Sequence, residues 1–97
     1  MVKAVHAVHS KTHNVHLDIK PDNILIGDDH LLKLTDFGFV RPAHKKIDKV
    51  CGTQGYLAPE QLHLRRDTVV PYDGVKADIF SLGIVLFAIQ FGSLPFP

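Results

Sequence analysis

The chain has 97 residues and a mass of 10.8 kDa, which is room for one modest core and excludes a second domain within these residues. Hydrophobic residues make up 45 % and charged residues 22 %, a balance that excludes disordered, collagen-like and low-complexity proteins. The net charge of +1 gives no basis for binding nucleic acid, and the single cysteine, Cys51, excludes an internal disulfide framework.

The first predicted element is the end of a helix over residues 1–12. Apolar residues recur there at a spacing of three, at Val2, Val5 and Val8, which is typical of one helix face. Residues 13–23 are polar and interrupted by a proline, so they are expected to form a loop.

A small β-hairpin is predicted next. Two short apolar runs, residues 24–26 and 31–34, flank the turn-forming sequence GDDH at 27–30. Residues 36–57 contain scattered Gly and Pro and no sustained periodicity, so we expect a long loop there. Loops of that length inside a compact domain usually carry function.

The C-terminal part is predicted to hold two helices. A short one begins near Ala58 and Pro59, because proline is tolerated in a first turn. Residues 65–74 are expected to form a loop. Residues 75–91, VKADIFSLGIVLFAIQF, are apolar on nearly every side, which is typical of a buried central helix. The uninterrupted apolar stretch is shorter than a membrane span requires, so no span is predicted.

Four short signatures occur in order along the chain: His16–Asn23 (HLDIKPDN), Asp36–Gly38 (DFG), Gly52-Thr53 followed by Ala58–Glu60 (APE), and Asp78–Gly83 (DIFSLG). Each signature alone is weak, but their order and spacing together are specific. The set resembles the eukaryotic protein kinase family over essentially the whole chain. The resemblance implies an α+β, protein-kinase-like fold, with residues 1–97 forming part of the mainly α-helical C-terminal lobe and one small β-hairpin.

The residue types also fit phosphoryl transfer by their own chemistry. That reaction needs metal ions to neutralise phosphate charge and a carboxylate to orient the attacking hydroxyl. Asp36 and Asn23 offer the oxygen ligands that Mg²⁺ prefers, and the hairpin between them can bring them to one site. Asp18 can face the substrate hydroxyl, and Lys20 can place a positive charge on the transferred phosphate.

The resemblance assigns roles to these positions. It implies that Asp18 is the catalytic base, that Lys20 contacts phosphate as in serine/threonine kinases, and that Thr53 links the substrate loop to the catalytic site. It implies that Asn23 and Asp36 are the magnesium ligands. Leu25 matches the apolar residue beneath the adenine ring of ATP, so the implied cofactors are ATP and Mg²⁺.

Four further positions match structural members of the family. His16 and Phe37 match two residues of the hydrophobic stack that links the kinase lobes. Asp78 matches a buried helix carboxylate that accepts hydrogen bonds from the catalytic-loop backbone, without which its burial would be costly. Glu60 matches a carboxylate whose usual arginine partner would lie beyond Pro97.

The chain departs from the family pattern at Leu17, where an arginine usually contacts a phosphorylated activation loop. Between Asp36 and Glu60 the only hydroxyl side chains are those of Thr53 and Tyr56, both at motif positions. We therefore expect a kinase that is not switched on by phosphorylation of this loop.

The 97 residues contain no glycine-rich loop, no strand lysine for the phosphates and no helix glutamate to pair with that lysine. The sequence is therefore expected to be an excerpt of a longer kinase domain. On its own it is expected to bind ATP weakly, to be inactive, and to expose apolar area on residues 75–91.

Two alternatives to a serine/threonine kinase remain open from sequence. The chain could be a non-catalytic, pseudokinase-like binding segment. The spacing of His6, His9, His13 and His16 could also place imidazoles on one helix face as zinc ligands. As partners we expect a protein substrate and ATP, with no nucleic acid and no membrane span, in an intracellular, cytoplasmic setting.

Overall fold

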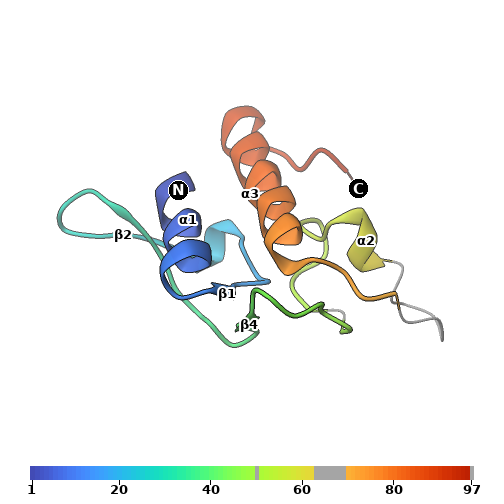
Figure 1. The fold of residues 1–97 in the computed structure, drawn as a ribbon. Helices are drawn as coiled ribbons and strands as arrows, with labels where there is room; N and C mark the ends of the chain where they lie inside the picture. The colour runs from blue at the N-terminus through green and yellow to red at the C-terminus, as the bar shows by residue number, and fades with distance from the viewer. Residues whose placement is uncertain (50, 63–69, 97) are drawn as a thin grey trace.

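The computed structural model describes residues 1–49, 51–62 and 70–96. In chain order the elements are α1 (Val2–Lys11), β1 (Asn14–Val15), the 3-10 turn η1 (Pro21–Asn23), β2 (Ile24–Ile26), β3 (Leu32–Leu34), β4 (Arg41–Pro42), α2 (Pro59–Leu62) and α3 (Gly74–Phe91). Figure 1 shows α3 in the middle of the molecule, with α1 and the β2–β3 hairpin on one side and α2 on the other. The predicted loop at 65–74 lies partly outside the described residues.

The predicted hairpin is confirmed. Strands β2 and β3 are antiparallel, with Ile24 opposite Leu34 and Ile26 opposite Leu32. Gly27 closes the turn, because its N–H donates to the Leu31 carbonyl at 2.8 Å. This pairing fixes which residues lie together at the base of the hairpin.

A second pair of strands was not predicted. Strand β1 pairs with β4 in antiparallel register, with Val15 opposite Arg41, so two short strands interrupt the loops expected at 13–23 and 36–57. Each strand has only two residues, too few to show the alternation by which strands are recognised in a sequence. We call the loop of the HLDIKPDN signature, His16–Asn23, the catalytic loop after its match to the family. The β1–β4 pairing ties the start of this loop to the segment that follows the DFG signature.

Helix α3 begins and ends on recognisable caps. Asp73 Oδ1 accepts hydrogen bonds from the backbone N–H groups of Val75 and Lys76, which have no partner within the helix. Gly92 adopts a left-handed conformation with φ of 75° and donates its N–H to the Ala88 carbonyl. The predicted helix is therefore confirmed to within one residue at its start.

The core consists of two adjoining clusters that meet on α3. The first contains Val15, Leu17, Ile47, Ala58, Tyr72 and Ala77, and the second contains Val5, Ile19, Leu82 and Val85. Residues of the catalytic loop thus supply apolar side chains to both clusters. The loop is held in place by packing on each side of its polar residues.

Helix α3 is not buried on every side. Its first half carries most of the buried residues, whereas Leu86, Phe87, Ile89 and Phe91 in its second half are exposed. By length and composition alone, α3 is the one helix among the described residues that could cross a membrane. A core helix passes the same test, and the buried Asp78 on α3 is hydrogen-bonded to the catalytic loop.

Candidate active site

Asp78 anchors the catalytic loop to helix α3. Its side chain is 1 % exposed, and its two oxygens accept hydrogen bonds from the backbone N–H groups of His16 and Leu17, both at 2.8 Å. The His9 Nε2 lies 2.8 Å from Oδ2 and must carry the proton, because a carboxylate only accepts. Three donors compensate the burial of this charge, so the contact predicted between Asp78 and the loop backbone is confirmed.

Leu17 has a left-handed backbone at the point where its loop passes close to Gly52. Leu17 has φ of 68°, which is costly for a residue with a side chain and persists only where the surroundings enforce it. The Leu17 carbonyl also lies so close to Gly52 that a Cβ there would meet it at 2.8 Å. Gly52, with φ of 109°, therefore permits the approach of the two loops.

Asp18, Lys20 and Thr53 form one hydrogen-bonded group. The Thr53 hydroxyl donates to Asp18 Oδ1 at 2.8 Å and accepts from the Lys20 ammonium at 2.8 Å. The Lys20 Nζ lies 4.0 Å from Asp18 Oδ2. The structure thus brings together three predicted site residues, and Thr53 comes from a loop more than thirty positions away in sequence.

Asn23 is oriented by Asp18. Its Nδ2 donates to the Asp18 backbone carbonyl at 2.8 Å and to Asp18 Oδ2 at 3.2 Å. Asn23 is 5 % exposed and ends the η1 turn just before β2. With its nitrogen committed to Asp18, the amide oxygen is the atom left to ligate a cation.

Asp36 follows the residue that pairs with Asn23 at the base of the hairpin. The backbone N–H of Thr35 donates to the Asn23 carbonyl at 2.9 Å, so the two ends of the β2–β3 pair meet. Asp36 follows directly, in a left-handed conformation with φ of 59°, and its carboxylate is exposed. One carboxylate and one amide oxygen on adjacent strand ends fit Mg²⁺, which takes few protein oxygens and completes its shell with phosphate and water.

His16 links the catalytic loop to the DFG signature. Its Nδ1 accepts from the Asp18 N–H at 3.1 Å, so Nε2 carries the proton and donates to the Thr35 carbonyl at 2.9 Å. The ring also contacts Phe37 edge-on, with centroids 4.9 Å apart. The two residues that match the family's hydrophobic stack are therefore in contact here.

The remaining matched residues lie at the margins of the site. Leu25 is on β2, two residues after Asn23, and is 56 % exposed, so its side chain offers an apolar surface to a ligand. Glu60 is in the first turn of α2 and is half-buried. The Asp28 and Asp29 side chains lie exposed in the hairpin turn, away from this pair.

Gln61 and Tyr72 form a buried hydrogen-bond network that the sequence analysis does not predict. Gln61 is 2 % exposed; its Oε1 accepts from the Ala58 N–H at 2.7 Å, and its Nε2 donates to the Cys51 carbonyl at 3.4 Å and to the Tyr72 hydroxyl at 3.3 Å. The Tyr72 hydroxyl donates to the Lys49 carbonyl at 2.8 Å. Gln61 therefore joins the two ends of the loop that carries Thr53.

Burial in this network suppresses ionisation of its two acids. Burial raises the pKa of the Cys51 thiol, although the Tyr72 hydrogen bond and the Arg41 charge act in the opposite direction. Burial likewise raises the pKa of the Tyr72 hydroxyl well above its usual range. Both groups are therefore neutral near pH 7 and serve here as hydrogen-bonding groups.

The histidines suggested as zinc ligands are directed to other partners. His9 contacts Asp78, and both ring nitrogens of His16 are hydrogen-bonded. His6 and His13 are exposed. Within residues 1–49, 51–62 and 70–96, no three His, Cys, Asp or Glu side chains gather closely enough to hold a metal ion.

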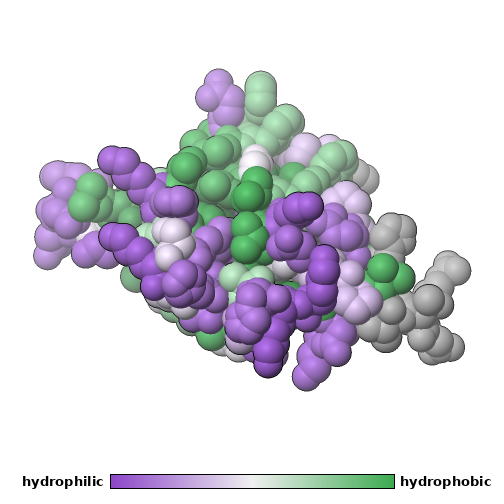
Figure 2. Space-filling model, viewed as in Figure 1, coloured by the Kyte–Doolittle hydropathy of each residue, from purple (hydrophilic) through white to green (hydrophobic). Residues whose placement is uncertain are grey.

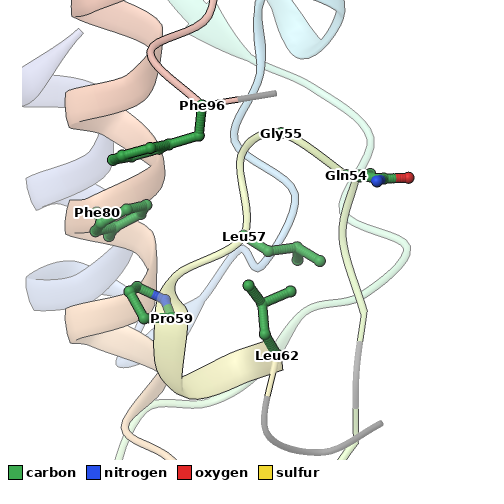
Figure 3. Close-up of a pocket in the computed structure, with 7 residues that line it drawn as sticks. All are labelled: Gln54, Gly55, Leu57, Pro59, Leu62, Phe80 and Phe96. Atoms are coloured by element: carbon green, nitrogen blue, oxygen red, sulfur yellow. The ribbon is translucent and has the colours of Figure 1, made fainter.

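An apolar pocket of about 420 Å³ opens beside the Thr53 loop. In Figure 3, Phe80 of α3 and Phe96 lie on one side of this pocket, Leu57 and Leu62 lie on the other, and the Gln54 side chain points away. Gln54 and Gly55, which directly follow Thr53 in sequence, line part of the pocket. The pocket is therefore next in sequence to the residue that contacts Asp18.

Comparison with known proteins agrees with this geometry. The family model described as "Protein kinase domain" matches residues 1–97. The chain is 41 % identical over 98 residues to the liver/testis phosphorylase b kinase gamma catalytic chain of Mus musculus and 40 % identical over 99 residues to that of Homo sapiens, covering 99 % of this chain and 24 % of each relative. It is 42 % identical over 101 residues to CBL-interacting serine/threonine-protein kinase 10 of Arabidopsis thaliana, covering 99 % of this chain and 20 % of that protein. The chain therefore spans about a quarter or less of these curated relatives.

Proposed function

The chain belongs to the protein kinase family, and on that premise we propose that it is the catalytic segment, from the larger lobe, of a serine/threonine protein kinase. Such an enzyme transfers the γ-phosphate of ATP to a hydroxyl group of a protein. The observation that carries the proposal is the Asp18–Thr53–Lys20 group, in which hydrogen bonds of 2.8 Å join two loops that are far apart in sequence. The adjacent Asn23–Asp36 pair supports it.

Asp18 is proposed as the catalytic residue that receives or orients the substrate hydroxyl. Its carboxylate is 9 % exposed, with Oδ1 held by Thr53 and Oδ2 facing Asn23 and Lys20. A carboxylate held in this way meets an incoming hydroxyl without reorganising, which is the basis of catalysis by positioning. The Lys20 ammonium, 4.0 Å from the carboxylate, is placed to neutralise the phosphoryl group as it transfers.

Asn23 and Asp36 are the residues that would hold magnesium, and Leu25 would contact the adenine ring. Bound Mg²⁺ supplies positive charge that offsets the charge of the phosphates. The protein contributes these two oxygens, and the Thr35–Asn23 backbone hydrogen bond joins the strand ends that carry them. His16 and Asp78 act as positioning residues, since they fix the backbone on which Asp18 is carried.

The preference for serine and threonine rests on Lys20 and on the relatives. Lys20 occupies the position at which the sequence matches serine/threonine kinases, and the Arabidopsis relative is named as a serine/threonine-protein kinase. In this structure Lys20 bonds Thr53 rather than lying free in solvent, which supports a fixed role at the site.

A chimera tests the proposal directly. Residues 1–97 replace the matching segment of the mouse phosphorylase b kinase gamma catalytic chain, which supplies the remaining parts of the domain. We expect Mg²⁺-dependent transfer of the labelled ATP phosphate to serine or threonine of a protein substrate. A soluble, folded chimera without transfer contradicts the proposal.

The 97 residues alone serve as the companion sample. We expect isothermal titration with Mg²⁺–ATP to show weak or no binding, because residues 1–97 lack a glycine-rich loop and a strand lysine. Binding of the isolated chain at micromolar concentration would contradict this part of the account.

A further inference from the structure

Gln61 holds both ends of the loop that carries Thr53, residues 51–58. Its Oε1 accepts a hydrogen bond from the Ala58 N–H at 2.7 Å, and its Nε2 donates to the Cys51 carbonyl at 3.4 Å. Cys51 begins this loop and Ala58 ends it, so a single side chain spans the loop. An amide can do this because it has an acceptor at one atom and donors at the other.

Tyr72 completes the arrangement from the segment before α3. Its hydroxyl accepts the second Nε2 hydrogen of Gln61 at 3.3 Å and donates to the Lys49 carbonyl at 2.8 Å. Its backbone exchanges hydrogen bonds of 2.8 and 2.9 Å with Ile47, so the ring is itself held in place. We call Gln61, Tyr72 and the groups they bond the amide network. Both side chains are buried, and a satisfied buried network specifies one arrangement of the segments it joins.

The loop that the amide network holds reaches the proposed reaction centre. The Thr53 hydroxyl donates to Asp18 Oδ1 and accepts from the Lys20 ammonium, both at 2.8 Å. The Thr53 carbonyl accepts from the Tyr56 N–H at 3.1 Å, and the Ser81 hydroxyl of α3 donates to the Tyr56 carbonyl at 2.6 Å. The loop is therefore attached to α3 at its middle and to the amide network at both ends.

We propose that Gln61 and Tyr72 are positioning residues for phosphoryl transfer. By fixing both ends of the loop, they place the Thr53 hydroxyl where it contacts Asp18 and Lys20. An apolar side chain of similar length would fill the space of Gln61 but could not bond the loop ends. This inference rests on the proposed kinase function and adds two residues to the site that performs it.

The metal side of the site is built from other segments. Asn23 and Asp36 lie at the ends of the β2–β3 hairpin, which meet through the hydrogen bond between Thr35 and Asn23. The hydrogen bonds of the amide network go to none of these residues. A positioning role therefore predicts a lower kcat with an unchanged KM for Mg²⁺–ATP.

Steady-state kinetics of the chimera that carries residues 1–97 test this. Gln61→Met keeps the side-chain length and removes its hydrogen bonds, and we expect kcat to fall about 10- to 100-fold, because a shift of about 1 Å suffices for such a loss. Tyr72→Phe should lower kcat about two- to tenfold. In both variants the KM for Mg²⁺–ATP should stay within about twofold. Gln90→Met, at an exposed position of α3, is the matched control and should leave kcat within about twofold. An unchanged kcat in both Gln61→Met and Tyr72→Phe would overturn the inference.

A background without the Thr53 hydroxyl separates positioning from a loss of folded enzyme. If the amide network acts through Thr53, Gln61→Met should lower kcat by less than about twofold once Thr53→Val is present. A loss of folded enzyme would lower kcat by the same factor in both backgrounds, because independent effects multiply. Equal factors in the two backgrounds would therefore overturn the inference.

Hydrogen exchange measures the placement of the loop without using transfer. The Tyr56 N–H, which bonds the Thr53 carbonyl, lies within residues 52–57, and mass spectrometry of the chimera can follow peptides from this segment. We expect Gln61→Met to raise exchange there at least about fivefold and to leave exchange in α3 unchanged, because local opening differs from global unfolding. An equal rise in both segments, or no rise in either, would overturn the inference.

The two measurements also separate this inference from the kinase function. A chimera that transfers phosphate, with equal kcat losses in the presence and absence of Thr53→Val, would refute the positioning role and leave the kinase function intact. A chimera without transfer, in which Gln61→Met raises exchange at residues 52–57 alone, would support the hold on the loop and refute the kinase function.

Discussion

Asp78 shows most clearly how one residue sets the geometry of this site. It is almost fully buried on α3, yet the three donors that satisfy it come from α1 and the catalytic loop. The charge therefore fixes the direction of the loop that carries Asp18. A buried carboxylate is stable only with such partners, so the loop and the helix depend on one another.

Replacing this charge is expected to destabilise the fold. In Asp78→Asn an amide N–H₂ faces a backbone N–H donor, which leaves a buried donor without an acceptor. We expect the free energy of unfolding to fall by about 2–4 kcal/mol, as measured by urea denaturation. Asp22→Asn, at an exposed position, is the matched control and should change stability by less than about 0.5 kcal/mol. Similar losses in both variants would contradict the role of Asp78.

The half-buried Cys51 thiol and the buried Tyr72 hydroxyl predict a loss of stability in alkali. The pKa of Cys51 and that of Tyr72 are raised in the folded chain, so the unfolded chain releases these protons first, above pH of about 8.5 for Cys and 10 for Tyr. Their stabilising contribution is complete below those pH values and is lost as pH rises above them. We expect the urea midpoint to fall between pH 8 and 11, and less so in Cys51→Ala with Tyr72→Phe. A flat profile in the unchanged chain would be inconsistent with their burial.

At the scale of single residues the sequence was a good guide where a motif fixed the position. Asp18, Lys20 and Thr53 were expected at one site and are hydrogen-bonded there. Gln61 and Tyr72 were missed because a buried polar side chain has no local signature. Gln61 follows the APE motif immediately, and only its contacts across the fold reveal its role.

Helix α3 packs so closely on strand β1 that one glycine is required at its start. A Cβ on Gly74 would lie 2.7 Å from a methyl group of Val15, which is itself fully buried. Further along, a Cβ on Gly83 would meet no atom within 4 Å. A side chain is therefore excluded at Gly74 but has room at Gly83.

The same substitution at these positions is expected to have opposite signs. Gly74→Ala overpacks the contact with Val15 and should cost about 1–3 kcal/mol. Gly83→Ala adds a methyl group in free space and removes glycine from a helix interior, so it should stabilise by about 0.5–1 kcal/mol. Thermal unfolding followed by circular dichroism compares the two variants. Destabilisation by Gly83→Ala, or none by Gly74→Ala, would contradict the packing described.

At the scale of elements, long patterns were predicted correctly and short pairings were not. The apolar run at 75–91 and the GDDH turn identified α3 and the hairpin, because each carries a clear pattern. The β1–β4 pair joins residues far apart in sequence through two residues on each side. Such a contact depends on the packed loops around it, so the local sequence contains no pattern from which it could be predicted.

The whole molecule is thin and leaves part of its apolar surface open. Its extents are 45 × 32 × 17 Å, and its radius of gyration is 13.3 Å, against about 12.5 Å for a compact chain of this length. Figure 2 shows apolar surface gathered over the upper part of the view, where α3 projects in Figure 1. Ile89 and Phe91 are 69 % and 65 % exposed. The expected apolar exposure on the central helix is thus confirmed.

This open face predicts self-association of the isolated chain. Large exposed apolar patches drive association in water. We expect sedimentation velocity to show species larger than 10.8 kDa, and Ile89→Glu with Phe91→Glu to shift the population toward the monomer. Ile26→Glu, at an exposed site on the hairpin, is the control and should have little effect. A monodisperse monomer for the unchanged chain would contradict the prediction.

At this largest scale the length of the chain acquires a different meaning. Ninety-seven residues first indicate room for one small domain, but the four ordered signatures indicate part of a larger kinase domain. Residue counts and surface scaling could not show this, because they assume that the chain covers all of its own core residues. The apolar residues in the second half of α3 are exposed, so the described part of the chain leaves this face of the helix uncovered.

The most direct test of the central claim compares two aspartates in the chimera. Asp18 is held by Thr53 at the proposed site, whereas Asp28 lies exposed in the hairpin turn. We predict that Asp18→Asn lowers the kcat for phosphoryl transfer by about 10²–10⁴-fold and that Asp28→Asn leaves it within about twofold. An Asp18→Asn enzyme that retains the kcat of the unchanged chimera would contradict the account.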